Sequence, residues 1–170
     1  MYANSKSYTV QQALNKLKKY CTYQDRCHKE VELKLKEMRI IIEASNQIII
    51  TLVQENYLNE ERFAISFVRG KFKIKKWGKQ RLILELKRRN ISKYLINKAI
   101  KQISDQEYKT TFERLAKRKA ESITAGTNIT KKKKLADYLL YRGWESPMVC
   151  LLYTSDAADE GLGVDLGGRR

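Results

Sequence analysis

The sequence predicts an all-α protein made of three tandem three-helix units, the third of them truncated. Apolar residues recur at helical spacing through most of the chain, and the single proline leaves those stretches unbroken. A leucine followed six residues later by a serine able to cap a helix occurs twice, as Leu86 with Ser92 and Leu140 with Ser146. With 32% charged and 9% aromatic residues, several small helical cores are favoured over one large interior.

The first unit is predicted over residues 8–55, after an N-terminal extension of residues 1–7. Its three apolar stripes are Leu14, Leu17 and Cys21, then Val31, Leu35 and Met38, then Ile48, Ile49, Leu52 and Val53. The β-branched runs at residues 40–42 and 48–51 are also compatible with strands. We predict helix for both, because the neighbouring Glu, Ala and Gln favour helix and turn residues are lacking.

The second unit is predicted over residues 56–103. Asn59 can cap its first helix, with Glu60 and Glu61 near the positive end of the helix dipole. Ser92 can cap its third helix. The stripes are Phe63, Ala64, Phe67 and Val68, then Leu82, Ile83 and Leu86, then Ile96, Ala99, Ile100 and Ile103.

The third unit is predicted over residues 104–149, with a polar loop at residues 124–130. Gly143 suits the left-handed end of its second helix, and Trp144 is expected in the core. Its last helix begins at Ser146 and Pro147 and is then cut off. Its stripes are Phe112, Leu115, Ala116 and Ile123, then Leu135, Tyr138 and Leu139. Aligned second helices place Leu35, Leu86 and Leu140 in equivalent positions, 51 and 54 residues apart.

Residues 150–170 differ in composition from the rest, with four acids, two arginines, no lysine and half of the glycines. This segment resembles a translated transposase-type sequencing adapter, which implies a non-native tail. Such a tail is expected to be disordered and to leave Leu135, Leu139 and Phe112 partly uncovered. The alternative is a genuine acidic tail. Residues 1–149 alone contain 33 basic and 15 acidic residues, a net charge of +18.

The whole chain has a formal charge of +16 and a pI near 9.8, which favours a polyanionic partner such as nucleic acid or a nucleoprotein. No apolar run reaches the ~20 residues that a membrane-spanning helix needs, and the first eight residues do not resemble a signal peptide. We therefore expect no membrane association and a cytoplasmic location. Three cysteines without metal-type pairing are expected to be reduced.

Basic residues crowd around Trp77 between the first two helices of the second unit, and binding is the function that they indicate. The predicted partner-binding or nucleic-acid-binding residues are Lys71, Lys73, Lys75, Lys76, Trp77, Lys79 and Arg81, with Arg88, Arg89, Lys131, Lys132, Lys133 and Lys134 as a second set. Trp77 could stack on a base, fill a partner's pocket, or pack over Gly78 to fix the connector. A solvated connector whose lysines only confer solubility is the simpler alternative.

Catalytic and metal-binding sites are not indicated. Cys21 and Cys27 lack the spacing of a usual zinc pair, and His28 adjoins Cys27 in sequence without facing it on a helix. Glu60 and Glu61 are interpreted as first-turn acids. The sequence also lacks a glycine-rich phosphate loop, so no cofactor is expected and any nucleotide dependence would come from a partner.

Five segments together resemble the RecX family of recombination regulators. They are YLNEERFA at 57–64, KKWGKQRLILEL at 75–86, NIS at 90–92, YQDRCHKEVELKL at 23–35 and KLADYLLYRGWES at 134–146. The resemblance implies three tandem three-helix units in an elongated, curved molecule. It also implies a non-enzymatic protein that binds RecA, along the groove of its filament on single-stranded DNA, and lowers its ATPase and strand-exchange activities. We expect a monomer.

A different class of function remains open. Short three-helix units can resemble helix-turn-helix modules, so the chain could be a general basic DNA-binding or RNA-binding protein without RecA dependence. Direct DNA contact is compatible with both interpretations. A direct binder should hold naked DNA with a steep salt dependence, whereas a filament modulator should act mainly when RecA is present.

Overall fold

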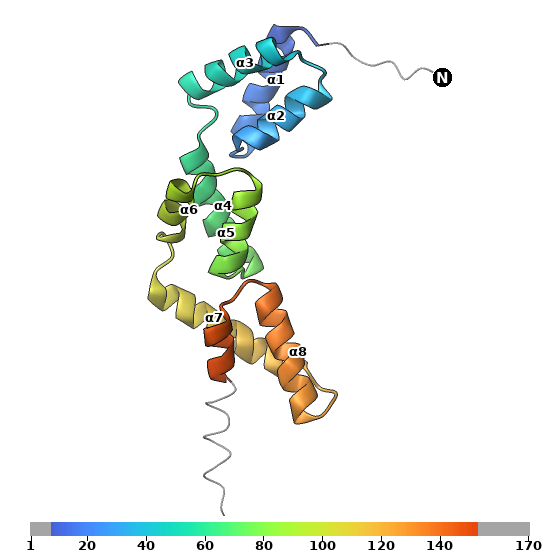
Figure 1. Ribbon diagram of the computed structural model, residues 1–170, viewed down its shortest axis with the longest axis vertical. Helices are drawn as coiled ribbons and strands as arrows, with labels where there is room; N and C mark the ends of the chain where they lie inside the picture. The colour runs from blue at the N-terminus through green and yellow to red at the C-terminus, as the bar shows by residue number, and fades with distance from the viewer. Residues whose placement is uncertain (1–7, 153–170) are drawn as a thin grey trace, which may run out of the picture. The chain divides into compact units, whose positions relative to one another are not determined.

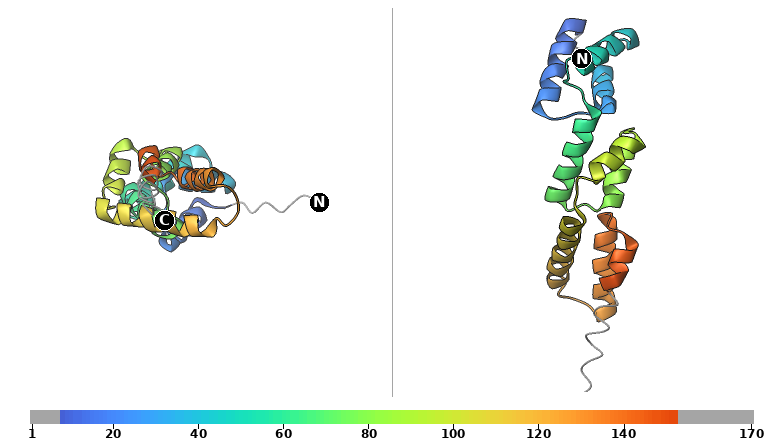
Figure 2. Two further views of the ribbon diagram at one scale, coloured as in Figure 1. Left: turned by 90° about the horizontal axis from the view of Figure 1, so that it is seen from below. Right: turned by 90° about the vertical axis from the view of Figure 1, so that its left-hand side faces the viewer.

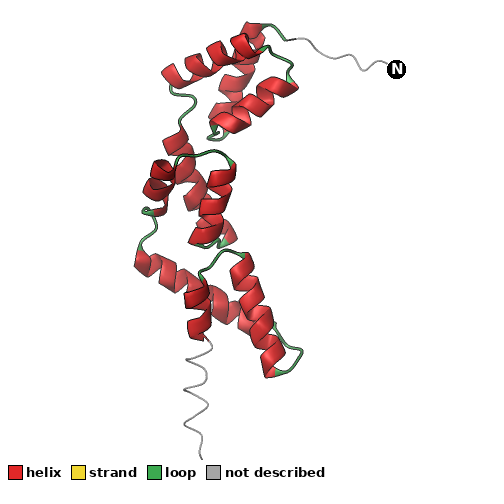
Figure 3. Cartoon of the chain, in the orientation of Figure 1, coloured by secondary structure: helices red, strands yellow, loops and turns green. Residues whose placement is uncertain are grey.

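The described part of the chain, residues 8–152, consists of helices joined by loops and turns and contains no strand in this computed structural model (Figures 1 and 3). The all-α prediction is therefore confirmed. The helices are α1 Val10–Tyr23, α2 His28–Glu37, α3 Ile42–Gln54, α4 Glu60–Lys75, α5 Lys79–Arg88, α6 Lys93–Ile100, α7 Asp105–Ser122 and α8 Asn128–Tyr141. Residues 146–152 form a further helical segment. Among the described residues, no helix is long and apolar enough to cross a membrane.

The first three helices surround one apolar core, and α3 packs against both α1 and α2 (Figure 2). A capping box starts α1: the Thr9 hydroxyl accepts from the Gln12 N–H, and the Gln12 side chain accepts from the Thr9 N–H. The buried residues of this core are Ala13, Leu17, Cys21, Val31, Leu35, Met38, Ile48, Leu52 and Leu58. They match most of the predicted stripes, although Val53 is 45% exposed.

The predicted helix through residues 40–42 is wrong at its first two positions. The chain turns at residues 38–39, and α3 begins only at Ile42 with Ile41 as its N-cap. Arg39 adopts a left-handed conformation with a φ of 56°, which a sequence pattern without glycine did not suggest. The helix prediction for residues 48–51 is confirmed.

The second helix of each predicted unit ends in the same Schellman motif. A left-handed residue follows the last turn, and the next residue donates its N–H back to the carbonyl oxygen of a buried leucine. The left-handed residues are Arg39, Asn90 and Gly143, the donors are Ile40, Ile91 and Trp144, and the acceptors are Leu35, Leu86 and Leu139. This shared geometry is an internal repeat at the level of hydrogen bonds.

The repeat corrects the predicted alignment by one residue. Leu139 is fully buried and accepts the hydrogen bond, whereas Leu140 is 41% exposed. Leu139 is therefore the equivalent of Leu35 and Leu86, and the second separation is 53 residues rather than 54. The predicted left-handed conformation of Gly143 is confirmed by its φ of 82°.

The basic connector expected after α4 is mostly helical. Lys71, Lys73 and Lys75 belong to α4 itself, and only residues 76–78 separate it from α5. Both predicted caps in this region are confirmed. The Asn59 side chain accepts from the Arg62 N–H at 2.9 Å, and the Ser92 hydroxyl accepts from the Leu95 N–H at 3.3 Å.

In the third predicted unit, α7 packs against α8. The loop between them covers residues 123–127, which is shorter than predicted, because the Thr127 side chain caps α8. Phe112 and Leu139 are buried, contrary to the expectation that they would be partly uncovered, and Leu135 is half-buried. Val149, in the helical segment 146–152, is buried as well, so this short segment already covers core surface.

The described residues group into two compact units. One contains residues 8–70 and 83–103, and the other contains residues 71–82 and 104–152. The end of α4 and the start of α5 therefore pack with α7 and α8. The predicted boundaries at 8–55, 56–103 and 104–149 stay predictions. The predictions for residues 1–7 and for the tail from residue 153 lie outside the described residues.

Candidate interaction surface

The turn between α4 and α5 is fastened to the C-terminal end of α8. The Gly78 N–H donates to the Arg142 carbonyl oxygen at 2.8 Å, and the Gln80 N–H donates to that of Gly143 at 3.1 Å. A Cβ atom at Gly78 would lie 2.2 Å from the Gly143 carbonyl oxygen, so only glycine allows this approach. The basic turn is thus held by backbone contacts.

Trp77 lies in a cluster of alternating cationic and aromatic side chains. The Lys71 ammonium is 5.5 Å and the Arg81 guanidinium 4.3 Å from the centre of the Trp77 ring. Arg81 also lies 4.7 Å from the Tyr141 ring and donates to the Tyr141 carbonyl oxygen at 2.9 Å. We call Lys71, Trp77, Arg81 and Tyr141 the Trp77 cluster; cation–π contacts hold its charges at the surface.

Lys79 is anchored by its neighbours. Its N–H donates to the Tyr108 hydroxyl at 2.9 Å, its ammonium lies 4.4 Å from the Tyr108 ring, and it pairs with Asp105 at 3.3 Å. Tyr108 in turn donates to the Glu145 carboxylate at 2.6 Å. Burial, with the hydrogen bond to Glu145, raises the pKa of Tyr108 far above its ordinary value. Tyr108 therefore ties α7 to the start of α5 as an acceptor and to Glu145 as a donor.

The remaining predicted binding residues differ in their surroundings. Lys73 and Lys75 are exposed on the last turn of α4, and Lys76 is half-buried. Arg88 and Arg89 both pair with Glu85, and Arg89 also contacts Glu30 and the Phe67 ring. Hydrogen bonding from Arg89 lowers the pKa of Glu85 against the opposing effect of burial. Arg89 therefore takes part in packing, whereas Arg88 forms its ion pair at an exposed position.

The four consecutive lysines lie in the N-terminal half of α8. Lys133 and Lys134 are exposed, and Lys131 and Lys132 are half-buried. Cations near a helix N-terminus are electrostatically unfavourable. The four lysines at this end of α8 therefore do not stabilise the helix, and their position is compatible with a role in binding.

A cavity of about 240 Å³ lies beside the α4–α5 turn. It is lined by Lys76, Thr111, Arg114, Leu115 and Arg118. Of these, the sequence-based prediction included only Lys76. The regular spacing of the two arginines, four residues apart on α7, was the signal that could have identified them.

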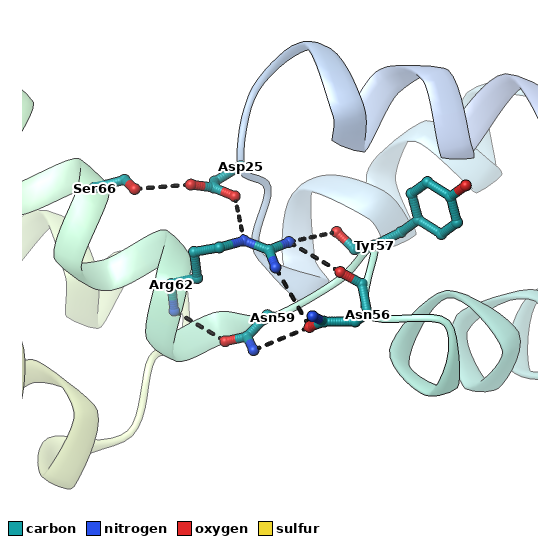
Figure 4. Close-up of polar contacts among 6 residues, drawn as sticks. All are labelled: Asp25, Asn56, Tyr57, Asn59, Arg62 and Ser66. Carbon is teal, nitrogen blue, oxygen red and sulfur yellow. Dashed lines mark hydrogen bonds and ion pairs between the residues drawn. The ribbon is translucent and has the colours of Figure 1, made fainter.

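The start of α4 is secured by a polar network around Arg62 (Figure 4). Its guanidinium donates to Asp25 at 2.7 Å, to the Asn56 side chain and to the carbonyl oxygens of Asn56 and Tyr57. The Ser66 hydroxyl donates to the second Asp25 oxygen at 2.7 Å. Burial by itself would raise the pKa of Asp25, but these hydrogen bonds and the Arg62 charge outweigh it, so the pKa is lowered.

Groups suited to metal binding or nucleophilic chemistry do not converge in residues 8–152. No set of three or more His, Cys, Asp or Glu side chains is placed to hold a metal there. His28 pairs with Glu60 at 2.8 Å. Burial raises the pKa of the Cys21 thiol and of the Cys27 thiol, which disfavours the reactive thiolate. These groups support the fold.

The fold is all-helical, and the unit of residues 71–82 and 104–152 has a basic surface. The family model for the second three-helix domain of RecX matches residues 59–100. The regulatory protein RecX of Bacillus cytotoxicus is 23% identical over 89% of this chain and 57% of its own length. RecX of Yersinia enterocolitica is 32% identical over 63% of this chain and 62% of its own length.

The crystal structure of RecX from Lactobacillus salivarius has a similar fold. Its TM-score is 0.72 at 23% identity, with 86% of this chain and 95% of that chain covered. The family model and the curated relatives all point to similarity with the RecX family, and the solved structure shows that this chain shares its fold. It spans between 38% and 57% of the length of the first curated relatives that it matches.

Proposed function

We propose that this protein regulates RecA by binding it, or its filament on single-stranded DNA, and inhibiting its ATPase and strand-exchange activities. The observation that carries the proposal is the match of residues 59–100 to a RecX domain, because that segment contains Lys71–Arg81. Family relatives are named regulatory proteins. The proposed action is therefore binding by a monomer, without catalysis by this chain.

Charge supplies the physical basis of the proposed binding. Residues 71–82 contain five lysines, one arginine and no acidic residue. The exposed Lys73 and Lys75 and the partly covered Trp77 cluster can approach an acidic protein surface or a nucleoprotein filament at modest desolvation cost. Contacts of this kind are individually weak, and several on one chain add through their high effective concentration.

The direct test is the rate of RecA-dependent ATP hydrolysis on single-stranded DNA, with and without the full chain. We expect this rate, and the yield of strand exchange, to fall as the protein is added. An unchanged rate and an unchanged yield at saturating protein would reject the proposal. Hydrolysis must also be measured without RecA, to show that the chain adds none of its own.

A second function is favoured by the aromatic side chains within the basic surface. Trp77 and Tyr141 alternate with Lys71 and Arg81, and such surfaces bind single-stranded nucleic acid by stacking and charge. A general nucleic-acid-binding protein would bind an oligonucleotide without RecA, with affinity that falls steeply as salt rises. Anisotropy titrations at several salt concentrations distinguish the two functions.

A further inference from the structure

The cavity beside the α4–α5 turn contains three cationic side chains on two walls. Thr111, Arg114, Leu115 and Arg118 are spaced by three and four residues, so they share one face of α7. Lys76 lines the cavity from the turn. Among the described residues, no carboxylate lines this cavity.

The two arginines are free to bind a ligand. Within residues 8–152 neither guanidinium forms an ion pair or a side-chain hydrogen bond, and both side chains are exposed. Many other arginines of the chain differ: Arg62, Arg81, Arg88 and Arg89 each have such a partner. Arg114 and Arg118 therefore retain their hydrogen-bonding capacity for an external acceptor.

The second wall is held in place. The Lys76 N–H donates to the Phe72 carbonyl oxygen at 3.1 Å, and its own carbonyl oxygen accepts from the Trp144 indole at 3.2 Å. Its φ of 55° is uncommon for a residue with a side chain. These contacts fix the backbone of Lys76, so its flexible side chain extends from a defined point beside the cavity.

We propose that this cavity binds a phosphate group. Guanidinium groups bind phosphate oxygens in pairs, a lysine adds a point charge, and the Thr111 hydroxyl can donate a further hydrogen bond. The volume of about 240 Å³ is below the usual range for drug-sized ligands and suits a single phosphate with part of its ester substituent. Leu115 offers the apolar contact for that substituent. The proposal does not rest on RecA regulation.

The phosphate could be free or part of a nucleic-acid backbone, and two probes separate these sources. The first is inorganic phosphate, titrated by calorimetry into the full chain at constant ionic strength in chloride. The second is a fluorescein-labelled oligothymidylate without a terminal phosphate, followed by anisotropy. Binding of phosphate alone indicates a free phosphate source, and binding of the oligonucleotide indicates a backbone source.

The decisive variants remove equal charge from two faces of α7. Arg114→Gln with Arg118→Gln alters the cavity, whereas Lys109→Gln with Lys117→Gln removes two exposed cations that do not line it. We expect the arginine double variant to raise the dissociation constant of whichever probe binds by about tenfold or more. The lysine double variant should raise it by less than about threefold. The double variant Arg114→Lys with Arg118→Lys keeps the charge without the planar fork and should lie between them.

Circular dichroism must show that each variant keeps its helical signal. If the glutamine variant unfolds, the comparison between the Arg114→Lys, Arg118→Lys variant and the Lys109→Arg, Lys117→Arg variant replaces it, since both preserve charge. Equal losses for the cavity and control variants would overturn the proposal, because only non-specific attraction would then be at work. Absence of binding by both probes would overturn it as well.

Discussion

The indole Nε1 of Trp144 donates to the carbonyl oxygen of Lys76 at 3.2 Å, although 68 residues separate them in sequence. Trp144 is fully buried, with its ring 4.5 Å from that of Tyr108 and 5.2 Å from that of Phe112. The same side chain therefore fills the α7–α8 core and fixes the basic turn. Substitutions in this core should consequently disturb the candidate binding residues too.

Replacing Gly78 by alanine should destabilise the protein. The added Cβ would meet three backbone atoms of Gly143 and Trp144 at 2.2 to 2.6 Å, and backbone atoms cannot move aside cheaply. We expect a loss of about 2 kcal/mol or more in the free energy of unfolding. Denaturant unfolding measures it.

Gly70→Ala is the matched control for that experiment. Gly70 lies inside α4 and an added Cβ would meet nothing within 4 Å. Alanine should stabilise the helix by about 0.5 to 1 kcal/mol. Equal effects of the two substitutions would contradict the close approach described for Gly78.

Tyr108→Phe should cost about 1 to 3 kcal/mol of stability. The substitution keeps the ring but removes the hydroxyl that accepts from the Lys79 N–H and donates to Glu145. Tyr94→Phe removes the same atom from a side chain that is 71% exposed and should be nearly neutral. Thermal unfolding of both variants tests the difference, and a neutral Tyr108→Phe would argue against the network.

The Asp25–Arg62 pair should make stability depend on acid pH. The pKa of Asp25 is lower in the folded protein than its ordinary value of 3.8. As pH falls, Asp25 therefore takes up a proton in the unfolded chain before it does so in the folded one. Its contribution to the free energy of unfolding is fully present above about pH 4 and is lost as pH falls through the folded pKa.

Asp25→Asn tests this relation. Its stability deficit relative to the unmodified protein should be largest near neutral pH and should shrink below about pH 4. Urea unfolding at several pH values measures the deficit. Glu32→Gln removes one charge from an exposed position of α2 and controls for the change in net charge. A deficit that stays constant with pH would contradict the coupling.

Charge reversal at Lys73 and Lys75 should weaken RecA inhibition while leaving the fold intact. Both side chains are exposed on α4, in contrast to Lys79, which is engaged by Tyr108 and Asp105. We expect the midpoint of inhibition to rise by about tenfold for Lys73→Glu with Lys75→Glu. Lys19→Glu with Lys36→Glu, on α1 and α2, alters the charge equally and should have a smaller effect. Equal shifts would place the contact elsewhere.

Much of the local structure could be predicted from the sequence. Asn59 and Ser92 are caps, Gly143 is left-handed and Trp144 is buried, as expected. Each of these features depends on residues a few positions apart, where spacing and side-chain type suffice. The RecX resemblance is supported as well, whereas the contact residues and the elongated, curved arrangement stay predictions.

The sequence alone determined that this is a basic, all-helical chain with its main apolar stripes and several helix ends. The tertiary structure decided which charges remain available. Arg81 donates to the Tyr141 carbonyl oxygen, 60 residues away in sequence, and Lys76 lines the same cavity as Arg114 and Arg118. Position 78 must be glycine because the Gly143 backbone packs directly against it. Periodicity assigns a residue to a face of its own helix, but it does not say which distant segment packs there. That choice follows from packing and backbone hydrogen bonds between segments remote in sequence.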